Sequence, residues 1–359
     1  MQFRKTIATI AKLALSAALI GFLIHRAASD PQFGTLVSGP KNWPLLLCAL
    51  PICLFAVTIT ILRWHLLVRA IGLSFTIGQT LRAGFLGYLA NLLPFGLVAG
   101  DSLKAVMLIH NNPHRKTEAV ASVLVDRVLG LYALLLLAAV ASLLLPTESL
   151  ARLGDSERAS IIRLCRCVQA AAVVSSFGIF VLLIPAVTQS RLWDKLEHTP
   201  VIGKILHKLV AAMRTYRTRL DLLAGAVAVS FVVHIGYVTA IMVMSRSIGI
   251  DSAHQPPLGS IFVIVPPSMI AGALPIGFYE TAMTLLFQAV SPPGSPKNTG
   301  LLVALGYRLI QISIATIGLG YWLTGRREVE ELMDEVEDSP PELEDRSDAE
   351  DNPDGSDHS

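Results

Sequence analysis

Charged residues are scarce in this sequence, and familiar catalytic motifs are absent. Only 16% of the 359 residues are charged, whereas 53% are hydrophobic and the mean hydropathy is +0.58. Soluble proteins carry about 25% charged residues, so this composition excludes a chain of two or three ordinary soluble domains. The sequence has no G-x-x-x-x-G-K-[ST] phosphate loop, which excludes ATP hydrolysis of that type. It also has no convincing Ser-His-Asp or Cys-His arrangement for nucleophilic catalysis.

Cysteine is rare as well, and its spacing indicates packing rather than chemistry. The four cysteines form two close pairs, and neither pair has the spacing of a disulfide framework or a metal site. These residues are Cys48, Cys53, Cys165 and Cys167. His110 and His114 lie four residues apart, but the intervening Asn-Asn-Pro interrupts any helix between them. We therefore predict no metal site, and we expect no cofactor.

Long apolar runs are abundant in this sequence. Six of them are long enough to cross a hydrocarbon core of roughly 30 Å as helices that rise about 1.5 Å per residue. These predicted spans are residues 7–24, 43–62, 119–145, 168–187, 223–245 and 300–323. The first run resembles a signal peptide, but it exceeds the usual signal core of about 7 to 15 residues, so an uncleaved span is favoured. The fold class is therefore predicted to be all-α, a polytopic membrane protein.

Two further apolar stretches, residues 75–110 and 258–290, are interrupted by proline and glycine. The interruptions contain Pro94 and Gly96 in the first stretch and Pro275 and Gly277 in the second. Proline removes a backbone donor and glycine permits a reversal of the chain. Such breaks persist at membrane depth only where they face protein or water. Each stretch is predicted to form a re-entrant helical hairpin, in addition to the six spans.

Lysine and arginine in short loops predict the orientation, because they accumulate on the cytoplasmic side. The segments assigned to the cytoplasm are the N-terminus, 63–82, 104–116 and 191–219, and those assigned outside are 246–260 and 291–299. The two hairpins then enter from opposite faces, and six spans leave both termini in the cytoplasm. The arginine-rich segment 152–166 is an exception, because it would face outward. Arg63-Trp64-His65 and Arg69 are predicted to mark a membrane interface.

The two halves of the chain resemble each other at an offset of 181 residues. Pro94 aligns with Pro275 and Arg127 with Arg308, so each arginine follows its proline by 33 residues. With three spans in each half, the second half would be inverted relative to the first, as in many transporters. The predicted units are membrane repeat 1 (1–147), membrane repeat 2 (148–327) and a tail (328–359).

Charge is divided unevenly between the body and the tail. Residues 1–327 contain 28 of the 29 Lys and Arg but only 12 of the 27 acids, which gives +16, and the tail carries −14. The basic body suits membrane lipids with anionic head groups, and no nucleic-acid partner is expected. The tail is poor in large apolar residues, so we predict a disordered cytoplasmic segment that could recruit a cytoplasmic partner.

Ionisable residues deep inside predicted spans are candidate site residues. Asp126 and Arg127 lie about eight residues, or roughly 12 Å, into their span, and Arg308 lies equally deep in the last one. Such residues cost about 2.5 to 3.5 kcal/mol to insert, and so face the bundle interior or a wet cavity. Arg127 and Arg308 are predicted to bind a lipid head group, although Asp126 and Arg127 alternatively snorkel or pair structurally. The helix N-termini that follow the breaks, at Pro94, Gly96, Pro275 and Gly277, offer N–H groups for its phosphate.

An acidic residue follows each break. Asp101 is either a proton or cation site or an ordinary helix N-cap. Glu280 lies in a segment without Lys or Arg, so it is protonated, paired with a distant arginine such as Arg308, or facing water. Together with Asp126, these residues are predicted to shape the site or to couple it to protons.

These motifs resemble the lysylphosphatidylglycerol synthase transmembrane region, also called the flippase-like family. The resemblance covers about residues 5–325. The segments that carry it are Arg63-Trp64-His65-Leu66-Leu67, Tyr88-Leu89-Ala90-Asn91-Leu92-Leu93-Pro94, Gly100-Asp101, Lys104-Ala105, Ala121-Ser122-Val123-Leu124-Val125-Asp126-Arg127-Val128-Leu129-Gly130, Leu274-Pro275-Ile276-Gly277-Phe278-Tyr279-Glu280 and Gly306-Tyr307-Arg308.

The resemblance implies a protein of the bacterial inner membrane, because better understood relatives move aminoacylated phosphatidylglycerol across the bilayer. We expect a transporter of a phospholipid or another anionic lipid. The alternatives are an accessory protein or enzyme of envelope-lipid or polyprenyl-phosphate metabolism, and a scaffold whose tail recruits a partner. No soluble aminoacyl-transferase domain follows the membrane region, so an enzyme is not expected. Ile276, Phe278 and Tyr279 replace glycines or smaller residues of the family pattern, which leaves the head group open.

Overall fold

The described part of the protein is a bundle of helices without strands. The computed structural model describes residues 21–22, 25, 28–29, 34, 37–92, 97–144, 154–184, 214–272 and 277–325. Five of its helices are long and apolar enough to cross a membrane. They are α3 (Trp43–Ala70), α6 (Lys116–Leu143), α8 (Asp155–Leu183), α12 (Leu220–Ser247) and α15 (Thr299–Thr324). The chain is therefore a multi-pass helical membrane protein, and nearly all of the predicted first span, 7–24, lies outside the described residues.

Helix α3 extends further than its apolar run. It begins after Asn42, whose side-chain oxygen accepts a hydrogen bond from the backbone N–H of Leu45 at 3.1 Å, as expected for an N-cap. It ends at Ala70, eight residues beyond the predicted boundary, because Arg63 and Trp64 are buried inside the bundle. The prediction of a membrane interface is therefore wrong for Arg63 and Trp64, whereas Arg69 in the last turn of α3 is exposed.

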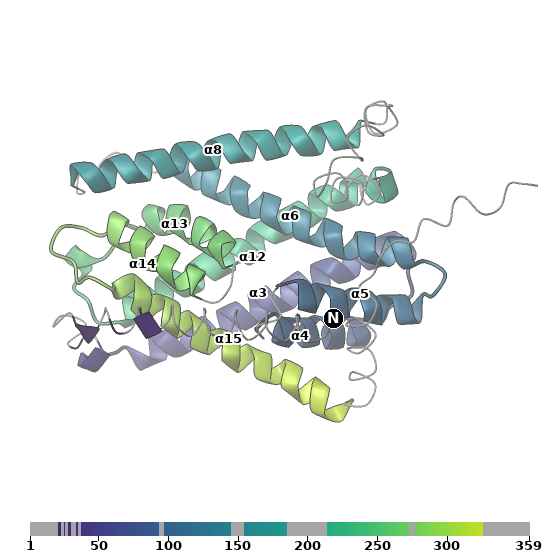
Figure 1. Ribbon diagram of the computed structural model, residues 1–359, viewed down its shortest axis with the longest axis horizontal. Helices are drawn as coiled ribbons and strands as arrows, with labels where there is room; N and C mark the ends of the chain where they lie inside the picture. Colours follow the sequence, from purple (N-terminus) through teal and green to yellow (C-terminus); the bar gives the residue numbers. More distant parts are fainter. Residues whose placement is uncertain are drawn as a thin grey trace, which may run out of the picture.

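Helix α8 also differs from its predicted bounds. It begins at Asp155 rather than at residue 168, so most of the predicted arginine-rich loop is helical. The arginines in it are exposed, namely Arg158, Arg163 and Arg166. In Figure 1 α8 lies at the edge of the bundle beside α6, which it contacts extensively. Its large exposed side chains include Val174 and Phe177, which suits a lipid-facing surface.

Helices α3 and α12 are antiparallel and form the central contact of the bundle. At one end the N–H of Asn42 donates to the carbonyl of Ser247 at 2.9 Å. At the other end the hydroxyl of Tyr216, just before α12, donates to the carbonyl of Leu67 at 2.9 Å. These two contacts define the two ends of the molecule.

The first interrupted stretch forms two short helices packed side by side. They are α4 (Ile77–Leu92), before residues 93–96, and α5 (Leu97–Asn111), after them, and the two helices pack against each other. With 16 and 15 residues, each is roughly 24 Å long or less and so is shorter than the hydrocarbon core. The side chain of Gln79 donates to that of Asn111 at 2.9 Å. The pair therefore begins and ends at the same end of the bundle.

The second interrupted stretch has the same construction. It comprises α13 (Leu258–Ala271), before residues 273–276, and α14 (Phe278–Val290), after them, and the two helices pack against each other. The hydroxyl of Ser295, after α14, donates to the carbonyl of His254, before α13, at 2.8 Å. This helix pair also begins and ends at one end of the bundle.

The two helix pairs open at opposite ends of the bundle (Figure 1). Arg115, which follows α5, donates to the carbonyl of Ile71 just after α3, at 2.8 Å. The second pair instead follows the C-terminus of α12, where Ser247 meets Asn42 at the start of α3. Helix α4 packs against α15, and α13 packs against α6, so each pair contacts a long helix from the other half of the chain.

Candidate functional site

A cavity of about 320 Å³ lies in the middle of the bundle and contains both predicted arginines. Its wall comes from α3, α4, α5, α6, α12, α13, α14 and α15. The lining residues include the charged side chains Lys104, Asp126, Arg127 and Arg308, the polar side chains Asn91, His234 and Gln311, four tyrosines, and the apolar side chains Val57, Ile61, Leu92, Leu131, Leu134, Met269 and Ile270. Arg127 and Arg308 are 181 positions apart in the sequence, and the fold brings them to one cavity.

Arg127, on α6, is held by the carboxylate of Asp101 on α5. Its Nε and Nη2 donate to the two oxygens of Asp101, both at 2.6 Å. Asp101 lies four residues inside α5, which begins at Leu97, so the predicted N-cap role is wrong. The Arg127 side chain is still 38% exposed. Its Nη1 has no hydrogen bond to a described residue and is available to a ligand.

Arg308, on α15, is held in a similar way by Glu280 on α14. Its Nε and Nη2 donate to Oε1 of Glu280 at 2.9 and 2.7 Å. The other carboxylate oxygen, Oε2, accepts the backbone N–H of Gly277 at 2.9 Å. Glu280 is fully buried, whereas Arg308 remains 21% exposed. Of the three arrangements considered from the sequence, pairing with Arg308 is the one that the structure contains.

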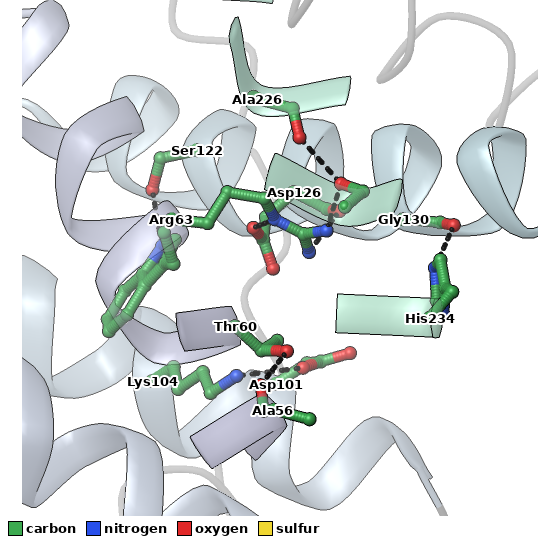
Figure 2. A network of polar contacts seen from close by, with 12 residues as sticks. Ala56, Thr60, Arg63, Asp101, Lys104, Ser122, Asp126, Gly130, Ala226 and His234 are labelled. Atoms are coloured by element: carbon green, nitrogen blue, oxygen red, sulfur yellow. Dashed lines mark hydrogen bonds and ion pairs between the residues drawn. The ribbon is translucent and has the colours of Figure 1, made fainter. Parts of the chain in front are cut away.

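Asp126 has a different partner from its neighbour in the sequence, as Figure 2 shows. Arg63, on α3, donates from Nε to Oδ1 of Asp126 at 2.8 Å and from Nη2 to the backbone carbonyl of Asp126 at 3.1 Å. Its Nη1 donates to Ser230 on α12. Both charged side chains are at most 5% exposed. These contacts connect three helices, and of the two charged residues Asp126 lines the cavity.

Lys104 belongs to the sequence segments that resemble the family, but it was given no site role from the sequence, and the structure places it in the cavity wall. Its ammonium lies 3.9 Å from Asp101 and 5.6 Å from the centre of the Trp64 ring, within cation–π range. The ring nitrogen of Trp64 in turn donates to Ser122 at 3.3 Å. Lys104 follows Asp101 by three residues in a helix, which is the spacing of an ion pair. This spacing was the sequence signal that could have indicated a site role for Lys104.

The charges around the cavity do not balance. Each of the three carboxylates accepts hydrogen bonds from an arginine, and Lys104 shares Asp101 with Arg127. The cations are Arg63, Lys104, Arg127 and Arg308, and the anions are Asp101, Asp126 and Glu280. One positive charge is therefore in excess among the described residues, at a depth where charge is costly. An anion would neutralise it.

The predicted break residues lie mostly outside the described part of the chain. This applies to Pro94, Gly96 and Pro275. Gly277 is described and has φ of 108°, in the left-handed region that favours glycine. Its N–H already bonds to Glu280, so that amide is not free for a phosphate. Among the described residues, no three His, Cys, Asp or Glu side chains are grouped as a metal site would require.

Comparison with known families gives a match over most of the chain. A family model described as the lysylphosphatidylglycerol synthase TM region matches residues 9–318. Comparisons with curated proteins and with solved structures give no match. The matched range includes all the charged pairs of the cavity.

Proposed function

Because the chain belongs to the lysylphosphatidylglycerol synthase transmembrane-region family, we propose that it moves an anionic lipid between the leaflets of a bilayer. One observation carries this proposal: Arg127 and Arg308 line a single cavity in the middle of a membrane-spanning bundle. Each keeps an Nη1 atom free of described protein partners, while a carboxylate fixes the rest of its guanidinium. Arginine held in this way binds phosphate with defined geometry.

The size and lining of the cavity suit a lipid head group. A volume of about 320 Å³ is near the lower limit of roughly 300 to 1,000 Å³ for ligand pockets. It therefore accommodates a head group rather than a whole phospholipid. The apolar side chains Leu131, Leu134 and Ile270 line the same cavity, and so provide a surface for the start of an acyl chain.

We further propose that the two halves are inverted repeats that move against each other. In both halves, a carboxylate on the helix after the break holds an arginine on the following long helix. Each helix pair packs on the long helix of the other half, and the two pairs open at opposite ends. This arrangement matches transporters whose binding site lies near mid-membrane between inverted repeats. Rocking of one half would expose the cavity to each side in turn.

The proposed location is the bacterial cytoplasmic membrane, with both termini in the cytoplasm. The segments 63–82, 104–116 and 191–219 were assigned to the cytoplasm by charge. Arg63 and Lys104 lie inside the bundle, but Arg115, Tyr216 and Arg219 of these segments meet at one end of it, near the C-terminus of α3. The positive-inside rule favours that end as cytoplasmic. The acidic tail, 328–359, lies outside the described residues, and its recruitment of a partner stays a prediction.

The carboxylates favour transport over catalysis. A general base needs a carboxylate that is free to take a proton from a substrate. Asp101, Asp126 and Glu280 are instead each bound to an arginine. The proposal is therefore a transporter and not an enzyme of envelope-lipid or polyprenyl-phosphate metabolism.

Reconstitution of the purified protein into vesicles with a fluorescent anionic phospholipid tests this function. We expect lipid to move between leaflets, and Arg127→Ala or Arg308→Ala to slow movement by about tenfold to a hundredfold, because hydrogen bonds to charged groups contribute about 1.5 to 3 kcal/mol. Arg163→Ala, on the exposed side of α8, is the matched control and should retain the wild-type rate. Wild-type rates in both cavity variants, or conversion of the lipid into a new species, would contradict the proposal.

A further inference from the structure

Three buried polar atoms in the cavity have no hydrogen-bond partner among the described residues. They are Nδ1 of His234, the hydroxyl of Tyr279 and Oε1 of Gln311. The first lies on α12, the second on α14 and the third on α15. A buried polar atom that stays unpaired costs about 1 to 3 kcal/mol. Three such atoms around one cavity therefore indicate a ligand with matching groups.

The chemistry of these atoms specifies what the ligand must supply. Nε2 of His234 lies 2.9 Å from the carbonyl oxygen of Gly130 (Figure 2). A carbonyl only accepts, so Nε2 carries the hydrogen and Nδ1 of the neutral ring is an acceptor. Oε1 of Gln311 is also an acceptor, whereas the Tyr279 hydroxyl can accept or donate. These atoms match hydroxyl groups, which donate and accept.

The positive charge of the cavity specifies a second part of the ligand. Arg127 and Arg308 each present Nη1, and the surrounding cations exceed the carboxylates by one. A phosphate diester provides one negative charge and several acceptor oxygens. Arg308 immediately follows Tyr307 and precedes Gln311 by one helical turn, so the phosphate and hydroxyl partners lie on the same helix.

Among the described residues, the cavity has no free anion for an ammonium group. Its three carboxylates are paired, and the undescribed break residues, 93–96 and 273–276, contain no Asp or Glu. An ammonium ion would lie near uncompensated positive charge, which is unfavourable. The tyrosines do not form an open cage either, because the Tyr307 ring packs against Tyr279 and Tyr237 at centroid distances of 5.5 and 6.5 Å.

From these contacts we infer that the cavity selects a head group in which a phosphate diester joins the lipid to a neutral, hydroxyl-bearing unit such as glycerol or a sugar. Head groups that carry an ammonium, including aminoacylated ones, bind less well. Arg127 and Arg308 hold the phosphate, and His234, Tyr279 and Gln311 recognise the hydroxyl groups. The inference rests on the proposed function, because it names the lipid class for the same cavity.

Equilibrium binding to the full-length protein in detergent tests the inference without requiring transport. The probes are dioctanoyl forms of phosphatidylglycerol, phosphatidylpropanol and phosphatidylethanolamine. Phosphatidylpropanol keeps the charge and chain length of phosphatidylglycerol but lacks its two head-group hydroxyls. We expect phosphatidylglycerol to bind about threefold to tenfold more tightly than phosphatidylpropanol for each hydrogen bond made. Phosphatidylethanolamine should bind most weakly of the three.

Two conservative variants test whether Tyr279 and Gln311 cause the preference for phosphatidylglycerol over phosphatidylpropanol. Tyr279→Phe and Gln311→Met should each reduce the ratio between phosphatidylglycerol and phosphatidylpropanol affinities by about threefold to tenfold. The affinity for phosphatidylpropanol itself should not change. The matched controls are Tyr132→Phe and Gln169→Met, whose side chains bond to Ser176 and Ser142 on the α6–α8 side, away from the cavity. Both controls should keep the wild-type ratio.

Different results separate this inference from the proposed function. Equal binding of phosphatidylglycerol and phosphatidylpropanol, or tighter binding of phosphatidylethanolamine, overturns the head-group assignment and leaves transport open to another lipid. Selective binding without transfer between leaflets supports the assignment and contradicts transport. The soluble head group, glycerophosphoglycerol, should bind more weakly than the lipid. If glycerophosphoglycerol bound as tightly as phosphatidylglycerol, the head-group chemistry would stand, but the ligand would not need to be a lipid.

Discussion

Asp126 and Arg127 are neighbours in the sequence but have different roles in the structure. Successive residues of a helix point about 100° apart, so Asp126 reaches Arg63 on α3 whereas Arg127 reaches Asp101 on α5. The first pair is almost fully buried, and the second leaves its arginine exposed to the cavity. The depth of both residues could be predicted from the apolar run that surrounds them. Their partners could not, because the Arg63 contact joins residues 63 positions apart and depends on how α3 packs against α6.

Loss of Arg63 should therefore affect stability more than recognition. Arg63→Met leaves the Asp126 carboxylate buried without a counterion, which costs about 3 to 5 kcal/mol. Arg63→Met combined with Asp126→Asn removes that charge and should recover part of the loss. Thermal unfolding of the purified protein in detergent measures both effects. Equal melting temperatures for the single and double variants would contradict a structural ion pair.

At the scale of elements, interrupted helices were the most accurate prediction from the sequence. Proline and glycine in an apolar stretch predict a break, and both stretches are indeed divided into two short helices. Helix ends were less predictable, because hydropathy reports only which residues suit contact with lipid. Helix α3 continues past its apolar run, and the buried residues of that extension pack against other helices. The start of α14 adds a detail that hydropathy does not contain. Glu280 bonds back to the N–H of Gly277 and thereby fixes the helix that holds Arg308.

This junction makes Gly277 sensitive to substitution. Gly277→Ala places a Cβ on a residue with φ of 108°, a conformation that costs other residues about 1 to 3 kcal/mol. We expect a lower melting temperature and weaker lipid binding, because α14 positions Glu280 and through it Arg308. Gly320→Ala is the control, since Gly320 lies within α15 and its Cβ would meet no atom within 4 Å. That variant should be neutral or slightly stabilising, and an equal loss in both variants would contradict the explanation.

At the scale of the whole molecule, each helix pair packs against a long helix from the other half of the chain. The sequence offset of 181 residues aligns Arg127 with Arg308, and both arginines line one cavity, whereas the inverted repeat itself stays a prediction. The correspondence is incomplete, because the same offset from Arg63 and Asp126 leads to Met244 and Tyr307. The buried ion pair of the first half thus has no charged equivalent in the second. Tyr307 takes the place of Asp126 in this alignment, and its neutral side chain lines the cavity beside Arg308, which suits the proposed recognition of hydroxyl groups.

The opposite directions of the two helix pairs lead to a prediction about sidedness. His114 and Lys297 are exposed residues near the open ends of the first and second pairs, respectively. In a variant with its four native cysteines replaced by serine or alanine, His114→Cys should react with a membrane-impermeant maleimide only in inverted vesicles, where the cytoplasmic face is outward. Lys297→Cys should react only in right-side-out vesicles. The measurement is the labelled fraction of each variant in each vesicle type, with detergent-solubilised protein as the control for reactivity. Labelling of both positions from the same face would contradict the inverted arrangement, because helix pairs that open at opposite ends of a membrane-spanning bundle must meet opposite aqueous phases.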